Sequence, residues 1–206
     1  MIKVLGRLTS INVQKVMWCI DGLGLAHERT DLGGPFGGNK EAAYLAKNPN
    51  GVVPTIEDDG FVLWESNTCV RYIAAKYGAG TLWPTDPRVR ADGERWMDWQ
   101  LSTLGAPMTT VFWTFVRTKP EDRDLKAAEA AAKRLNELYP MVDKALAGRR
   151  FLAGDQLTVG DIELGGFAYR WYNLPVERVR LPNFEAWYAR LGERPAYKKN
   201  VMNPLV

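Results

Sequence analysis

The chain has 206 residues, of which 46% are hydrophobic and 25% are charged, as is usual for a globular protein with a full core. Its net charge of +3 is small, with 27 basic residues set against 24 acidic ones, which argues against a nucleic-acid-binding surface. No apolar run approaches the ~20 residues that span a bilayer, so we also expect no membrane partner.

The cysteine and histidine content excludes further classes of protein. Cys19 and Cys69 fall in helix-like patterns and form no CxxC pair, which favours a reduced, cytoplasmic setting over a disulfide framework. His27 is the single histidine, and it begins a predicted strand with no nucleophile motif near it. We therefore expect neither a metal site nor a Ser-His-Asp triad.

The first residues of the chain alternate between strand and helix patterns. A short apolar strand is expected over 2–6, a helix over 12–25, where apolar residues recur every three or four positions, and a second strand over 27–31. After a glycine-rich loop, we expect Asn39 to cap a short helix that ends at Leu45.

A hairpin and a helix complete this half. Two strands are expected over 53–57 and 61–64, and Ser66 begins a helix over 67–77. The order β-α-β-α-β-β-α requires a right-handed parallel crossover followed by an antiparallel pair. This is the thioredoxin-like α/β arrangement, and we assign residues 1–80 to it.

The second half of the chain is helical throughout. Residues 78–90 are rich in Gly and Pro and indicate a linker, after which we assign 88–206 to an all-α C-terminal domain. A long helix is predicted over 88–117, with a kink or a break at Pro107. An Ala-rich helix is predicted over 121–146.

The stretch "LTVGDIEL" (157–164) has a clear helix-start signal. Thr158 is the expected N-cap and Asp161 the acidic residue of a capping-box variant, while Leu157 and Ile162 are placed as a hydrophobic staple. We interpret this motif as structural, and we do not assign Asp161 a catalytic role.

Five stretches, taken in this order and at this spacing, resemble the cytosolic glutathione transferase family: "GRLTSINVQKVMW" (6–18), "NPNGVVPTIEDDG" (48–60), "LWESNTCVRYIAAKYG" (63–78), "LWPTDPRVRADGERWMDW" (82–99) and "FLAGDQLTVGDIEL" (151–164). The resemblance covers the whole chain and is greatest to the bacterial theta- and nu-like subgroup. It implies a thioredoxin-like N-terminal domain, an all-helical C-terminal domain and a homodimer.

Ser10 and Asn12 are the catalytic candidates that the resemblance implies. Many relatives have Pro at the position of Asn12, whereas nu-like members have Asn there. A thiol pKa of about 8.5 must fall by ~2 units, or ~2.7 kcal/mol, for glutathione to be a thiolate at neutral pH. One hydrogen bond to the sulfur (~1.5–3 kcal/mol) and a helix N-terminus (up to ~2 kcal/mol) would suffice. The alternative is that both residues only cap the helix.

The same resemblance implies a tripeptide site along the hairpin. Pro54 is cis in the family, which exposes the N–H and C=O of Val53 to the cysteinyl backbone of glutathione. Ser66 would bind the γ-glutamyl carboxylate at a helix N-terminus, and Glu65 would bind the ammonium group. The alternatives are an edge strand with a trans Pro, and an N-cap Ser beside a solvated Glu.

Three polar residues are further candidates for glutathione contacts. Asn39 aligns with a polar residue that meets the glycyl end in relatives, and Lys40 is the alternative by its charge. Asp98 is in a position from which some classes reach the partner subunit's γ-glutamyl amine, although a solvated helix charge is the alternative.

The second substrate is expected between the domains. Four apolar residues at helical spacing are candidates to line that site: Leu104, Met108, Phe112 and Trp113. Such residues also form ordinary helix core, which is the alternative.

We therefore predict a glutathione transferase that conjugates glutathione, its cosubstrate, to small hydrophobic electrophiles in detoxification, without a metal. One alternative is a glutathione-dependent disulfide or peroxide reductase or dehalogenase of the same fold. Omega-like members use a Cys at the position of Ser10, so a mixed disulfide on the enzyme is not expected. The other alternative is a non-catalytic glutathione-binding or interaction protein.

Overall fold

The computed structural model describes residues 1–206 and divides the chain into two compact units. The first comprises Met1–Trp83 together with Arg194–Asn203, and the second comprises Pro84–Glu193 with Pro204–Val206. Residues 194–203, which the sequence analysis placed in the helical domain, thus group with the first unit.

The first unit contains a four-stranded sheet in the order β2-β1-β3-β4. Its strands are short: β1 (Ile2–Leu5), β2 (His27–Thr30), β3 (Thr55–Asp58) and β4 (Phe61–Trp64). β1 pairs in parallel with β2, and β3 runs antiparallel to both β1 and β4. The predicted thioredoxin-like order is therefore confirmed.

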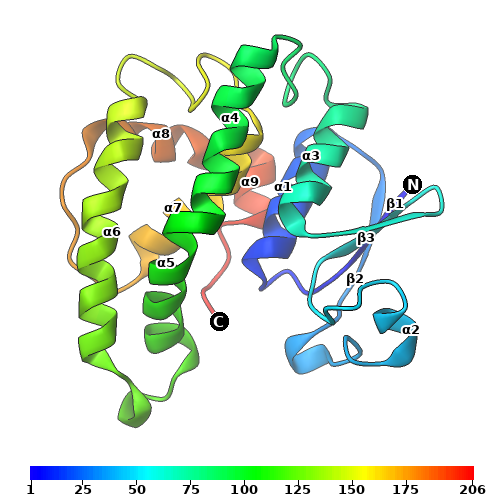
Figure 1. Ribbon diagram of the computed structural model, residues 1–206, viewed down its shortest axis with the longest axis horizontal. Helices are drawn as coiled ribbons and strands as arrows, with labels where there is room; N and C mark the ends of the chain where they lie inside the picture. Colours follow the sequence, from blue (N-terminus) through cyan, green and yellow to red (C-terminus); the bar gives the residue numbers. More distant parts are fainter. The chain divides into compact units, whose positions relative to one another are not determined.

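Helices α1 (Ile11–Gly22) and α3 (Ser66–Tyr77) pack together on one face of this sheet (Figure 1). Lys15 of α1 is only 1% exposed, and its Nζ donates a 3.0 Å hydrogen bond to Oδ1 of Asn67 in α3. This buried bond connects α1 to the first turn of α3.

The short helix α2 (Ala42–Leu45) begins later than predicted. Its N-cap is Glu41, so the expectation that Asn39 caps it is wrong. Asn39 Nδ2 instead donates to the carbonyl of Gly51 (2.8 Å). Because the Asn39 side chain makes this hydrogen bond, it is not available to cap α2.

Helix α9 (Pro195–Asn200) joins the first unit through its contacts with α1. The rings of Trp18 and Tyr197 meet edge to face with centroids 4.7 Å apart, and Asn200 Nδ2 donates to Asp21 Oδ2 (2.6 Å). The helical pattern alone did not reveal this pairing, because it depends on contacts far apart in the sequence.

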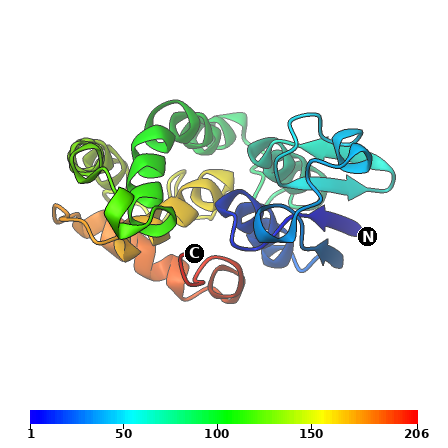
Figure 2. The same ribbon diagram turned by 90° about the horizontal axis from the view of Figure 1, so that it is seen from below.

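The second unit is a helical bundle. It contains α4 (Pro87–Trp99), α5 (Gly105–Phe112), α6 (Leu125–Ala145), α7 (Val159–Asn173) and α8 (Pro182–Gly192). α7 lies in the middle of these helices, and most of its residues are buried (Figure 2). None of the helices in the structure is both long enough and apolar enough to cross a membrane.

The long helix predicted over 88–117 is interrupted by two π-helical segments, Gln100–Leu104 and Trp113–Arg117. Pro107 lies in the first turn of α5, directly after the first of them. A proline lacks the N–H that an α-helix uses, which accounts for the irregular turn beside it. The chain stays helical through Pro107, so the helix is not broken there. π-helical segments often occur at functional sites.

The capping box at α7 is present as predicted. The backbone N–H of Thr158 donates to Asp161 Oδ2 (2.8 Å). Gly160 in the same turn approaches α4 so closely that a Cβ there would lie 2.4 Å from the carbonyl oxygen of Gly93. This motif stabilises the start of α7 and its packing against α4, so its role is structural.

Candidate functional site

Ser10 is the N-cap residue of α1, with φ −88° and ψ 122°. Its carbonyl accepts hydrogen bonds from the N–H groups of Val13 (3.0 Å) and Gln14 (2.9 Å). Its side chain makes no capping hydrogen bond, although Ser at this position usually makes one. The hydroxyl is partly exposed and free to bind a ligand at the positive end of the helix.

Asn12 is the second residue of α1, and its side chain is exposed. It makes no hydrogen bond within the chain, so it too caps nothing. The structure thus places two unengaged polar side chains in the first turn of one helix.

The peptide bond between Val53 and Pro54 is cis, as the family resemblance implies. Val53 precedes β3, and neither its N–H nor its C=O has a hydrogen-bond partner in the chain. Gly6 lies against it, since a Cβ on Gly6 would be 3.1 Å from Val53 Cβ and 2.6 Å from Val13 Cγ2. The unpaired backbone of Val53 is therefore next to the loop that leads to Ser10.

Glu65 is the N-cap of α3 and has φ 68° and ψ 109°, a strained conformation for a residue with a side chain. Such strain costs about 1–3 kcal/mol and is concentrated at functional sites. Its carboxylate is exposed and has no ion-pair partner. The alternative in which Ser66 is an N-cap is wrong, because Ser66 is the first helical residue.

Ser66 itself is 7% exposed, and its hydroxyl makes no hydrogen bond. A buried hydroxyl is normally paired, so this one is suited to accept or donate a bond to a ligand. The start of α3 thus resembles the start of α1 in leaving a serine hydroxyl without a hydrogen bond.

Two basic residues near this site were missed by the sequence analysis. Lys15, described above, is buried between α1 and α3. The guanidinium of Arg7 packs on Gly33 and Gly34, whose positive φ angles bring the loop close. A Cβ on Gly34 would lie 2.8 Å from Arg7 Cζ, and one on Gly33 would lie 3.1 Å from Arg7 Nη1 and 3.2 Å from Val53 Cγ1.

The Arg7 guanidinium has no acidic partner. Its Nε is buried without a hydrogen bond, and its side chain forms no ion pair. An unsatisfied guanidinium beside the unpaired backbone of Val53 is a candidate anion-binding group. The signal that could have found it is an Arg within three residues of Ser10, opposite a "GG" loop.

The candidates for the glycyl end are engaged elsewhere. Asn39 holds the carbonyl of Gly51, and Lys40 Nζ lies 3.4 Å from the carbonyl oxygen of Asn50. Both side chains hold the turn at 50–51 in place, which reduces their availability to a ligand.

The four second-substrate candidates fall into two groups. Leu104 and Met108 are 0% exposed and Phe112 is 4% exposed, as ordinary core residues are. Trp113 is 58% exposed, so it is the one with a large surface open to a ligand. Asp98 lies on α4 with its side chain exposed.

The cysteines do not provide a nucleophile. Cys19 and Cys69 are buried and unpaired, and burial raises the pKa of each thiol to about 12. The structure brings together no group of three side chains suited to hold a metal. Thiolate chemistry at this site therefore requires a sulfur from a ligand.

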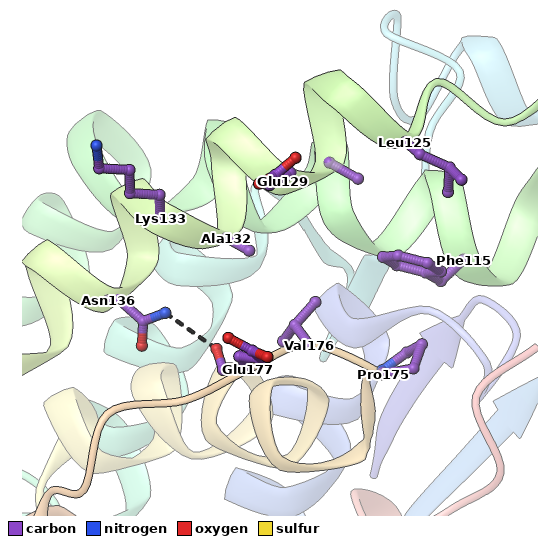
Figure 3. Close-up of a pocket in the computed structure, with 10 residues that line it drawn as sticks. Phe115, Leu125, Glu129, Ala132, Lys133, Asn136, Pro175, Val176 and Glu177 are labelled. Carbon is purple, nitrogen blue, oxygen red and sulfur yellow. Dashed lines mark hydrogen bonds between the residues drawn. The ribbon is translucent and has the colours of Figure 1, made fainter.

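A cavity of about 540 Å³ in the second unit lies elsewhere, and it contains none of the predicted site residues (Figure 3). It is lined by α6, Phe115 and the segment 175–177, and Asn136 Nδ2 donates across its edge to the carbonyl of Glu177 (3.0 Å). It contains no Ser, Cys or His, so it is not a candidate for the thiol chemistry.

Comparisons with known proteins match both halves of the chain to one family. Residues 9–76 match the model described as glutathione S-transferase, N-terminal domain, and residues 104–195 match the model described as glutathione S-transferase, C-terminal domain. The chain is 42% identical over 207 residues to glutathione S-transferase GstB of Escherichia coli strain K12, an alignment that covers 100% of both chains.

Solved structures give the same result. A crystal structure of the theta-class glutathione S-transferase from Xanthomonas axonopodis pv. citri, with glutathione bound, is 47% identical and superposes with a TM-score of 0.96 over 100% of this chain and 99% of that one. The apo form of that enzyme superposes with a TM-score of 0.87 at 42% identity, over 100% of this chain and 98% of the other. This chain belongs to the glutathione S-transferase family.

Proposed function

We propose that this enzyme binds glutathione as the thiolate at the start of α1 and transfers it to small, soft, hydrophobic electrophiles. The observation that supports this most directly is the hydroxyl of Ser10, which sits at a helix N-terminus without capping it. The hydroxyl donates to the glutathione sulfur, and the helix N-terminus favours its negative charge. Together these stabilise the thiolate by about 3–4 kcal/mol, enough to lower the thiol pKa below neutrality.

In the reaction, the sulfur attacks an electrophilic carbon. A C–S bond forms, and either the leaving group departs with its electron pair or the pair moves onto the acceptor in an addition. The enzyme contributes thiolate stabilisation and proximity, and no protein group is oxidised or reduced. Asn12 is placed to donate a second hydrogen bond through its amide, and the relative roles of Ser10 and Asn12 are separable by substitution.

The rest of glutathione binds to groups that the fold leaves unpaired. The N–H and C=O of Val53, turned by Pro54, pair with the cysteinyl backbone. The hydroxyl and N–H of Ser66 donate hydrogen bonds to the γ-glutamyl carboxylate at the N-terminus of α3, and the exposed Glu65 carboxylate binds the ammonium group.

The glycyl carboxylate binds to Arg7. Asn39 and Lys40 are the other polar groups nearby, and both already contact carbonyls of the turn at 50–51. Arg7 has no acidic partner and lies against Gly33, next to Val53. A guanidinium also suits a carboxylate better than an amide does, because it offers two parallel N–H donors.

We further propose that the enzyme is a cytoplasmic homodimer that acts in detoxification, and that Leu104, Met108, Phe112 and Trp113 shape the second-substrate site. Family membership supports the first proposal, and the exposed surface of Trp113 supports the second. Size-exclusion chromatography with light scattering tests the dimer, and Trp113→Ala tests the site by raising KM for an aryl halide.

The decisive test of function is glutathione binding and turnover. Glutathione should raise the melting temperature of the purified protein, and the enzyme should conjugate it to an aryl halide faster than it reduces hydroxyethyl disulfide. No thermal shift and no conjugation would overturn the proposal. Faster disulfide reduction would favour the reductase alternative.

A further inference from the structure

The carbonyl oxygen of Val52 is held by two buried side chains. Tyr44 Oη, in α2, donates to it at 2.6 Å, and Asn48 Nδ2, in the turn after α2, donates to it at 2.9 Å. Tyr44 is 4% exposed and Asn48 is 1% exposed, whereas Val52 itself is 53% exposed. Two buried polar groups are thus directed at one carbonyl of a surface residue.

Thr55, the first residue of β3, connects these two side chains. Its buried hydroxyl lies 2.8 Å from Tyr44 Oη and accepts from Asn48 Nδ2 at 3.2 Å. The hydroxyl hydrogen of Tyr44 goes to the Val52 carbonyl, and that of Thr55 goes to Tyr44 Oη. The two amide hydrogens of Asn48 go to Val52 and Thr55, and its Oδ1 accepts from the N–H of Asn50 (3.1 Å). Every polar group of the cluster is therefore paired, as a rigid buried network requires.

This network sets the direction of the next backbone N–H. The peptide bond between Val52 and Val53 is trans, because the one cis bond of the chain precedes Pro54. A trans peptide group is planar, with its C=O and N–H on opposite sides. A carbonyl fixed toward Tyr44 and Asn48 therefore directs the Val53 N–H away from them. That N–H has no partner in the chain although Val53 is only 9% exposed, and buried backbone groups are normally paired.

The preceding peptide group is held in the same way. Asn39 Nδ2 donates to the carbonyl of Gly51 (2.8 Å), and the N–H of Gly51 donates to the carbonyl of Asn48 (3.0 Å). Side chains therefore fix two consecutive carbonyls, those of Gly51 and Val52. The chain is constrained up to Val53, the residue whose own backbone groups are unpaired.

A simpler explanation is that the cluster only stabilises the loop between α2 and β3. A complete buried network adds rigidity, and the Val52 carbonyl needs a donor in any case. This explanation does not account for the unpaired N–H on the other side of the same peptide group. It also predicts that removal of a hydroxyl lowers the stability and leaves the selectivity between ligands unchanged.

We propose that Tyr44, Asn48 and Thr55 are positioning residues for glutathione, which hold the peptide group between Val52 and Val53 so that its N–H meets the cysteinyl carbonyl of the ligand. This rests on the proposed function, in which the Val53 backbone pairs with glutathione. A donor already oriented in the free protein needs no ordering when the ligand binds. The network therefore favours thiols that carry a cysteinyl amide, and it leaves the chemistry of the sulfur unchanged.

Selectivity between two ligands tests this role. Glutathione is compared with an analogue in which a trans alkene replaces the amide between cysteine and glycine, so that the acceptor for the Val53 N–H is missing. The wild type should bind glutathione about five- to tenfold more tightly, and Tyr44→Phe should reduce this ratio about threefold, as expected when one neutral hydrogen bond is weakened. Titration calorimetry measures the ratio. The kcat at saturating glutathione and the thiol pKa of bound glutathione should not change.

Tyr72→Phe is the matched control, because it removes a tyrosine hydroxyl that donates to Asp58 (2.8 Å) at the other end of β3. It should keep the wild-type ratio even where it lowers the melting temperature as much as Tyr44→Phe does. Thr55→Val removes the hydroxyl shared by Tyr44 and Asn48 and should lower the ratio, whereas Thr55→Ser keeps a hydroxyl and should restore it. A wild-type ratio in folded Tyr44→Phe or Thr55→Val would overturn the proposal.

Measurements on the free protein separate this proposal from the proposed function. In NMR relaxation of the backbone amides without ligand, the Val53 amide should be as rigid as β3 in the wild type and more mobile in Tyr44→Phe. If this difference is present but the wild type binds no glutathione, the oriented N–H stands and the proposed function fails. If glutathione is bound and turned over but Tyr44→Phe changes neither the amide nor the ratio, the positioning role is wrong and the transferase function stands.

Discussion

The helices α7 and α1 begin in opposite ways. At α7, the buried carboxylate of Asp161 accepts hydrogen bonds from the N–H of Thr158 (2.8 Å), the N–H of Leu152 (3.0 Å) and Nε1 of Trp187 (2.9 Å). At α1, the cap residue Ser10 has the right position and backbone for a cap, but its side chain makes no capping bond. In the sequence, the capping box of α7 and Ser10 of α1 are equally good helix-start signals. Only the structure shows that the first stabilises the fold and that the second leaves its side chain open to a ligand.

The largest expected effect is a loss of stability at the start of α7, where Asp161 is fully hydrogen-bonded. Asp161→Ala leaves four buried donors, these three and the hydroxyl of Thr158, without this acceptor, and we expect the free energy of unfolding to fall by about 3 kcal/mol or more. Denaturant unfolding measures this change, and the protein that remains folded should bind glutathione with unchanged affinity. Asp161→Asn keeps one acceptor oxygen and should lose less. If Asp161→Ala unfolds at the same denaturant concentration as the wild type, the motif is not structural.

At the start of α1, substitution of Ser10 should lower the activity and leave the stability unchanged. Ser10→Ala should lower kcat/KM by about 10- to 150-fold and raise the thiol pKa of bound glutathione by about 1–2 units, the effect of one hydrogen bond to a charged sulfur. Its melting temperature should not change, because no capping bond is lost. Ultraviolet absorbance of the thiolate against pH gives the pKa. The matched variant Ser10→Thr should keep most of the activity.

The same experiment on Asn12→Ala shows which residue dominates. A variant with a lower melting temperature and an unchanged thiol pKa would mark that side chain as a cap, and the contrast with α7 would not hold for it.

Arg7→Gln tests a group that only the structure revealed. We expect KM for glutathione to rise about tenfold through the loss of a charge-assisted bond to the glycyl carboxylate. The wild type should discriminate against the glycyl monoethyl ester of glutathione, and the variant should not. Arg29→Gln, in which the replaced arginine pairs with Asp31 in the same unit, is the control. If the variant keeps the wild-type preference for the free acid, another group binds the glycyl end.

The fold and several features of the candidate site could be predicted, because their signals are local. Alternating strand and helix patterns, the Pro54 position and the Glu65-Ser66 pair can all be read within a few residues. Arg7 and Lys15 could not be predicted, since charged residues are normally exposed and their burial depends on Gly33, Gly34 and Asn67.

The helical half was predictable in outline only. The spacing of Leu104, Met108 and Phe112 correctly indicates a shared helix face, but such spacing does not distinguish core from a ligand-lined wall. The same limit applies to α9, whose helical pattern gives no sign that it packs on α1. Both depend on tertiary contacts that periodicity does not encode.

The smallest expected change in stability is at the start of α3, where Glu65 has an unpaired side chain and a strained backbone. Glu65→Gly relieves the positive φ of 68° but adds chain entropy to the unfolded state. These effects oppose each other, so we expect a gain in the free energy of unfolding of no more than about 1 kcal/mol. Glu65→Gln keeps the strain and removes only the charge.

Both variants should weaken glutathione binding, because both lose the proposed partner of the γ-glutamyl ammonium group, but only Glu65→Gly should gain stability. Thermal unfolding and glutathione titration on the two variants separate the contributions. Loss of stability in Glu65→Gly would mean that the Glu65 side chain supports the fold, as Asp161 does at α7. A gain in stability with weaker binding would mean that the backbone strain at α3 is retained for the ligand.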